Sequence, residues 1–213
     1  MIDKNKNKIA QLGCCDSLWG RTWYSEWKND DDRLRLKFIL TNLKGKSVLD
    51  LGCSDGIISI EAARQGLFSV GVNMNSKELE MAHAFLEKED EYVKNRATFL
   101  THDIEDFETS ASFDNIICAE VLEHQVDPEV IVRKIHEIAD NSTNIIITVP
   151  NRNVKEGYNA RWELAGIHIQ FFNIDSLSAL LGKYFSNITF SSLYDDGKIH
   201  DAPFLLVVVN GKK

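Results

Sequence analysis

The sequence predicts an α/β protein built on a mostly parallel, seven-stranded sheet, with helices on both faces and an antiparallel hairpin at the C-terminal end. Short apolar runs alternate with helix-like segments from residue 47 onward, the pattern of parallel strands joined by crossover helices. The last two apolar runs are joined by a turn signal at Asp195-Asp196-Gly197, which favours a hairpin. A chain of 213 residues is long enough for one sizeable core.

Each element is expected from its own local pattern. The expected strands are residues 47–50, 68–75, 97–104, 113–119, 144–151, 187–193 and 203–209. The expected helices are residues 33–40, 57–63, 76–85, 128–138 and a last one that ends near residue 181. Ser76 is expected to cap the third of these helices, and Asp127 with Pro128 to open the fourth. We therefore divide the chain into an N-terminal helical lid or cap, residues 1–44, and a main domain, residues 45–213.

The composition excludes several classes of protein. A net charge of −8 and a pI of 5.3 argue against nonspecific binding to nucleic acid, which depends on Lys and Arg contacts to phosphate. The longest apolar stretch, residues 204–209, is far too short to span a membrane. The four cysteines lack metal-binding spacing, and two of them, Cys53 and Cys118, lie in segments that should be buried. Since no signal peptide is visible, we expect reduced thiols and a cytoplasmic protein.

An aromatic segment precedes the first strand. Residues 19–27 contain three of the four tryptophans together with Arg21. Such a segment forms either a hydrophobic cap on the core or a lid over a polar ligand.

The first strand leads into a glycine-containing loop and then a helix, a unit that places ligands over a helix N-terminus. Gly52 and Gly56 permit a tight turn, and Asp50 suits a ligand that carries an amine or a cation. A dinucleotide site is disfavoured because its fingerprint needs an acid about 20 residues on, where this chain has Asn73. The nucleophile elbow of an α/β-hydrolase, with Ser54 as nucleophile, is disfavoured because no run of strands precedes this loop.

Three segments carry a resemblance to a known family. Residues 48–56 resemble the first motif, D-x-G-x-G-x-G, of class I S-adenosylmethionine (SAM)-dependent methyltransferases, with Ser54 in place of the middle glycine. Residues 120–124, Glu-Val-Leu-Glu-His, resemble a segment of the ubiquinone-biosynthesis O-methyltransferases and their small-molecule relatives. Residues 168–177 resemble the H-x-x-F-F-x-x-x-x-L segment of the same superfamily. The resemblance covers roughly residues 45–210 and implies a Rossmann-like fold with SAM as cofactor and S-adenosylhomocysteine (SAH) as product.

The resemblance also implies a set of cofactor-binding residues. Asn73 stands where the family usually has an acid that binds the ribose hydroxyls, and Asp103 and Ile104 stand where the adenine is held. Arg21 would meet the SAM carboxylate from the N-terminal segment. The complete implied set is Arg21, Asp50, Gly52, Ser54, Gly56, Asn73, Met74, Asp103, Ile104 and Glu120.

Methyl transfer from a sulfonium needs positioning and, for a hydroxyl acceptor, a base. We expect His124 to be the base because it titrates near neutral pH and lies at a strand end, with Glu123 and His168 as further catalytic residues. The acceptor is expected to be a small molecule, methylated at oxygen rather than nitrogen, and the long segment 151–170 is expected to form its wall.

Besides an N-methyltransferase, two alternatives stay open. The same E-x-x-E-H pattern with a downstream histidine supplies metal ligands in small-RNA terminal ribose methyltransferases, so Glu120, Glu123, His124 and His168 form an alternative, less favoured divalent-metal site. The other alternative is a noncatalytic protein of the same fold, which Asn73 favours.

Overall fold

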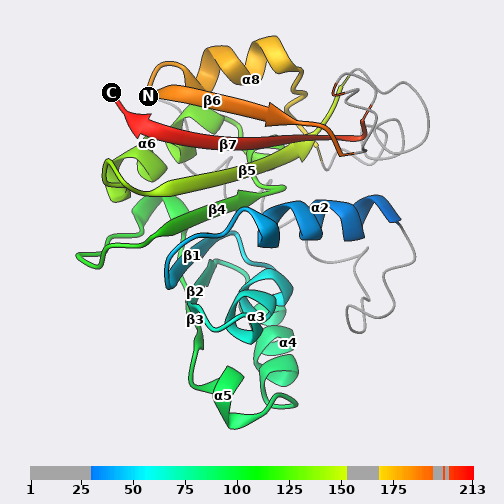
Figure 1. Cartoon of the computed structure of the whole chain (residues 1–213), viewed down its shortest axis with the longest axis vertical. Helices are drawn as coiled ribbons and strands as arrows, with labels where there is room; N and C mark the ends of the chain where they lie inside the picture. The colour runs from blue at the N-terminus through cyan, green and yellow to red at the C-terminus, as the bar shows by residue number, and fades with distance from the viewer. Residues whose placement is uncertain (1–29, 153–167, 194–198, 200–201) are drawn as a thin grey trace.

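The computed structural model describes residues 30–152, 168–193, 199 and 202–213. Its centre is a seven-stranded sheet in the order β3-β2-β1-β4-β5-β7-β6 (Figure 1). The first five strands pair in parallel with one another, and β7 is antiparallel to both β5 and β6. The strands are β1 (Ser47–Leu51), β2 (Phe68–Asn73), β3 (Ala97–Thr101), β4 (Asn115–Ala119), β5 (Asn144–Pro150), β6 (Phe185–Ser191) and β7 (Phe204–Lys212). The expected sheet and its C-terminal antiparallel pair are confirmed.

Helices cover both faces of the sheet, as the sequence predicts (Figure 1). The α-helices are α2 (Asp30–Thr41), α3 (Ile57–Arg64), α4 (Ser76–Leu86), α5 (Glu91–Lys94), α6 (Pro128–Ile138) and α8 (Ile174–Leu181), and the short 3₁₀ turns are η2 (Ile104–Asp106) and η3 (Leu122–His124). Apolar side chains of α6 and α8 pack with one face of the sheet, and those of α2 and α3 pack with the other.

Successive side chains of β1 pack against helices on opposite faces of the sheet. Val48 packs with Ile39 of α2 and Ala62 of α3, whereas Leu49 belongs to the larger cluster with Ile131 of α6. Successive side chains of a strand point to opposite faces, so a central parallel strand must be apolar on both. Strand β5 is accordingly buried along its whole length.

The helix starts differ from the predictions in two places. Asn75, not Ser76, caps α4, because the Asn75 side chain accepts a hydrogen bond from the Lys77 amide. Helix α2 begins at Asp30, one turn earlier than expected. The expected start of α6 is confirmed, since the Asp127 side chain accepts from the Glu129 amide and proline takes the first helical position.

Strand register brings the loops after β1, β2 and β3 to one edge of the sheet. Leu51 pairs with Val72, and Asn73 pairs with Thr101, so these three strands end side by side. Strand β1 also pairs with β4, and the chain order reverses between them. Ligands of open α/β sheets bind at this reversal, outside the carboxyl ends of the strands.

Among the described residues, none of the helices has the length and apolar character that a membrane span requires.

Candidate functional site

The glycine-containing loop is fixed onto the end of β2 by its backbone. The amides of Gly52 and Cys53 both donate to the Val72 carbonyl, at 2.8 and 3.1 Å. Gly52, Ser54 and Gly56 have φ angles of 80°, 49° and 77°, in the left-handed region that glycine adopts at least cost. A side chain on Gly52 would also place its Cβ 2.5 Å from Val121 Cγ2. The loop therefore has a single compact conformation that larger residues would disturb.

Asp50 is a buried acid beneath this loop, with only 1% of its surface exposed. Its Oδ2 accepts a 2.8 Å hydrogen bond from the Ser59 hydroxyl of α3. Burial raises the pKa of the Asp50 carboxyl group from 3.8 to about 7, although the hydrogen bond from Ser59 opposes the rise. Ser59 was not among the predicted site residues, and only its small polar side chain on a buried helix face would have pointed to it.

The ends of β2 and β3 lie next to the same loop. The His102 amide donates to the Asn73 carbonyl at 3.0 Å, so the residues that follow the two strands stay together. The Asp103 side chain accepts from the Glu105 amide and thus caps η2, while Ile104 is buried in the core. Met74 is half-buried. These residues occupy the expected edge, where the hydrogen bond between the Asp103 side chain and the Glu105 amide has a structural role.

Glu120 follows β4 on the other side of the chain reversal. Its backbone has φ 56°, and its Oε1 accepts a 2.9 Å hydrogen bond from Thr148 of β5. Arg35 of α2 approaches the same oxygen to 3.8 Å. Burial raises the pKa of Glu120 to about 8, the charge of Glu123 acts in the same direction, and Arg35 opposes it. Arg35 and Thr148 are site residues that motif reasoning did not identify.

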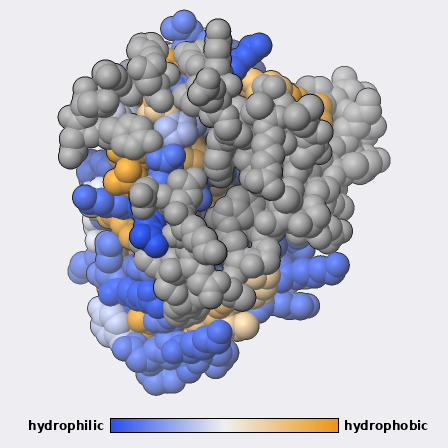
Figure 2. All heavy atoms as spheres, turned by 90° about the vertical axis from the view of Figure 1, so that its right-hand side faces the viewer, coloured by the Kyte–Doolittle hydropathy of each residue, from blue (hydrophilic) through white to orange (hydrophobic). Residues whose placement is uncertain are grey.

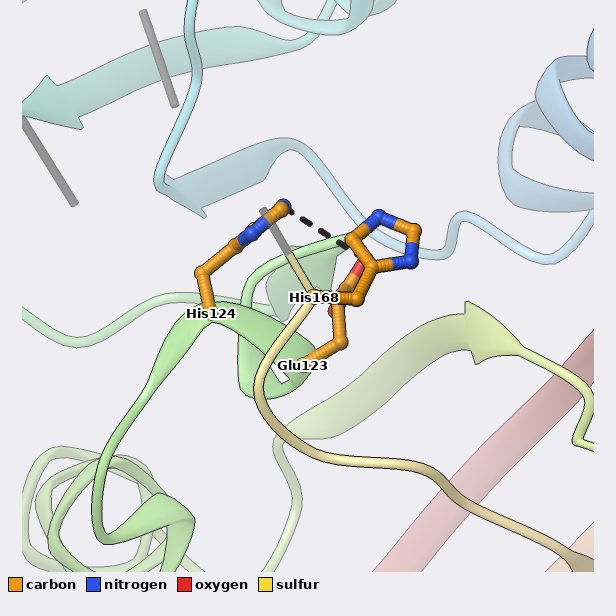
Figure 3. Close-up of side chains that lie close together, drawn as sticks. All are labelled: Glu123, His124 and His168. Atoms are coloured by element: carbon orange, nitrogen blue, oxygen red, sulfur yellow. Dashed lines mark ion pairs between the residues drawn. The ribbon is translucent and has the colours of Figure 1, made fainter. Parts of the chain in front are cut away.

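A compact group of three side chains lies beside Glu120. Glu123 and His124 come from η3, and His168 comes from the segment before α8; their side chains point toward one another (Figure 3). His124 Nε2 is 3.8 Å from Glu123 Oε1, and the two imidazole rings are 5.0 Å apart between centroids. The amides of Ile169 and Gln170 donate to the Glu123 carbonyl, which fixes the segment that carries His168.

The electrostatics of this group are unusual. Neither carboxylate oxygen of Glu123 has a hydrogen-bond partner among the described residues, and its side chain is only 1% exposed. Burial raises the pKa of Glu123 to about 8. Burial also lowers the pKa of His168 to about 4, with His124 acting in the same direction, so His168 is neutral at pH 7. One ligand atom from each of the three residues lies within 4.8 Å of the others, and such donors suit a divalent transition metal such as zinc.

The structure thus gathers the predicted residues into two groups along one edge of the sheet. Figure 2 views the molecule from this side, and the described residues visible around the rim of the view are mostly hydrophilic. Arg21, the rest of the aromatic segment 19–27 and residues 153–167 lie outside the described residues. The roles of residues 1–44 as a lid and of 151–170 as an acceptor wall stay predictions. Cys53 and Cys118, as expected, are buried free thiols.

Comparisons with known proteins agree with this arrangement. Residues 25–184 match the model of a family described as a methyltransferase domain. A ubiquinone biosynthesis O-methyltransferase of Vibrio campbellii is 32% identical over 129 residues, which are 57% of this chain and 52% of that protein. The protein of the same name from Pseudomonas syringae pv. tomato is 32% identical over 152 residues, 68% of this chain and 65% of that protein. The chain therefore spans between half and two thirds of the length of these relatives.

A solved structure shares the fold. The N-methyltransferase NodS from Bradyrhizobium japonicum, in complex with SAH, superposes with a TM-score of 0.67 over 98% of this chain and 99% of that one. The two sequences are 14% identical, so this likeness concerns the fold alone.

Proposed function

Because the chain belongs to the methyltransferase domain family, we propose that it transfers the methyl group of SAM to a hydroxyl group of a small-molecule acceptor. The observation that carries this proposal is the loop 52–56, fixed by Val72 above the buried Asp50 at the chain reversal of the sheet. The names of the O-methyltransferase relatives support oxygen as the methylated atom.

The cofactor would lie along the edge formed by β1, β2 and β3. The backbone of Gly52, Ser54 and Gly56 would line its amino-acid part, and the hydrogen bond between Asp50 and Ser59 would tie the end of β1 to α3. The family resemblance assigns the ribose to Asn73, the adenine to Asp103 and Ile104, and the carboxylate to Arg21. It also implies that Met74 and Glu120 contact the cofactor. The bound cofactor supplies an electrophilic methyl group on a sulfonium.

The acceptor would approach from the side of η3. His124 is half-buried and stands beside a neutral His168, so its imidazole is placed to take a proton from a hydroxyl group. His124 would take the hydroxyl proton as the acceptor oxygen bonds to the methyl carbon, and the electron pair of the broken carbon–sulfur bond would stay on sulfur. Glu123, whose Oε1 is 3.8 Å from His124 Nε2, would orient the imidazole and, once ionised, stabilise the imidazolium that results.

A metal-assisted reaction is the second candidate, favoured by one observation: Glu123, His124 and His168 converge, and the Glu123 carboxylate lacks hydrogen-bond partners in the described part of the chain. A divalent cation held by these residues would lower the pKa of the acceptor hydroxyl. In that case the three residues act as ligands, and His124 is not the base.

Calorimetric titration of the purified protein with SAM and with SAH tests the proposed function. We expect micromolar binding, about −8 kcal/mol. A folded protein that binds neither compound would contradict the proposal. Binding without SAH production across a panel of small hydroxyl and amine acceptors would favour the noncatalytic alternative, and turnover of amines alone would move the reaction to nitrogen.

A further inference from the structure

An amide and a carboxylate are joined at the end of β2. The Nδ2 of Asn73, the last residue of the strand, donates a 2.6 Å hydrogen bond to Oε2 of Glu78. Glu78 lies in the first turn of α4 and is half-buried. The cap of this helix is already supplied by Asn75, so the pair is not needed to start it.

The pair lies immediately beside the glycine-containing loop. Asn73 directly follows Val72, whose carbonyl accepts from the amides of Gly52 and Cys53. Glu78 is also close enough to the loop for its negative charge to help raise the pKa of the Cys53 thiol, after burial and Asp50. A carboxylate is therefore present at this edge, although the residue at the strand end is neutral.

The two remaining side-chain oxygens of the pair could accept hydrogen bonds from the two hydroxyl groups of a vicinal diol. Within the described part of the chain, Oε1 of Glu78 and Oδ1 of Asn73 make no hydrogen bond. Two hydroxyl groups need two acceptors, and an acceptor that carries charge binds roughly twice as strongly as a neutral one. Dinucleotide-binding folds likewise bind the ribose hydroxyls with an acid that lies beyond the glycine-rich turn.

We propose that Glu78, oriented by Asn73, is the carboxylate that binds the ribose hydroxyls of SAM in this protein. The inference rests on the proposed function, since it concerns the same cofactor. Asn73 then acts as a positioning residue as well as a neutral acceptor, and the acid that the strand end lacks is supplied from the helix that follows it.

Calorimetric titration with SAH tests the inference without a turnover assay. Glu78→Gln removes the charge and keeps the size of the side chain, and we expect at least a tenfold weaker Kd. Glu80→Gln is the matched control, because Glu80 is an exposed acid of the same helix; its Kd should equal that of the unmodified protein. Adding Asn73→Asp to Glu78→Gln returns a carboxylate to the site and should recover most of the lost affinity.

A second probe separates ribose recognition from a general loss of structure. The 2′,3′-dideoxy analogue of SAH lacks the proposed partners of Glu78. It should bind the unmodified protein much more weakly than SAH does, and Glu78→Gln should weaken its binding little further. An unchanged Kd for SAH in Glu78→Gln, or an equal loss for both probes, would overturn the inference. If the unmodified protein binds no SAH at all, the proposed function fails instead.

Discussion

Replacement of Asp50 by asparagine should stabilise the protein above pH 7 and have little effect near pH 4. Burial raises the pKa of this carboxyl group from 3.8 to about 7 in the folded protein. The folded state therefore holds more protons than the unfolded state between these pH values, so the free energy of unfolding falls as pH rises through this window. At about 1.4 kcal/mol for each pH unit, Asp50 costs the folded protein about 4 kcal/mol above pH 7. An asparagine oxygen can still accept the hydrogen bond from Ser59, which the variant keeps.

Urea unfolding of both proteins at a series of pH values from 4 to 8 measures this difference. Because Glu120, Glu123 and His168 titrate equally in both proteins, subtracting the two curves isolates Asp50. The gain in stability should grow between pH 4 and pH 7 and then level off, whereas Glu108→Gln, a change of the same charge at an exposed position, should give a flat difference. A flat or falling difference for Asp50→Asn would refute the reasoning that burial makes this acid costly.

Three further predictions concern the site. Gly52→Val should weaken SAH binding at least tenfold while the protein stays folded. The new Cβ would lie 2.5 Å from Val121 Cγ2 at a φ of 80°, so the loop would be displaced. Calorimetry measures the affinity and circular dichroism the folding; an unchanged affinity would mean that the loop is not the cofactor site. His124→Ala should lower kcat by roughly 10²–10⁴-fold and leave the Kd for SAH unchanged, as the loss of a general base does; an unchanged kcat would remove His124 from the mechanism. Dialysis against a chelator should leave turnover intact if His124 is the base, whereas loss of turnover restored by one added metal would select the cluster of Glu123, His124 and His168 as ligands instead.

Much of the fold was predictable because its signals are local. The apolar runs of β1, β4 and β5 and the Asp127-Pro128 start of α6 were read correctly from neighbouring residues alone. The start of α4 was missed by one residue because Asn75 and Ser76 are both good caps, and the choice depends on which side chain reaches the Lys77 amide.

The structure gathers the predicted site residues at one edge of the sheet, but their contacts with one another could not be predicted from the sequence. Glycines and acids at strand ends identify the edge where a ligand binds, because parallel strands all end on the same side. The partners of those acids come from elsewhere in the chain: Ser59 for Asp50, Thr148 and Arg35 for Glu120. No spacing rule links such pairs, since strand register and helix packing bring them together.

The sequence by itself determined the α/β class and the family resemblance, and it predicted the edge of the sheet at which we propose the site, because periodicity, turn residues and short motifs act over a few neighbouring residues. Only the tertiary structure decided the pKa values of the acids at that edge and the partners of its side chains. It buried Asp50 and Glu123, left Glu120 only partly exposed, and so raised the pKa values of all three carboxyl groups. It also set His168 beside His124 and joined Asn73 to Glu78. Burial and charge pairing depend on residues distant in the chain, and these become neighbours only when the strands and helices have packed.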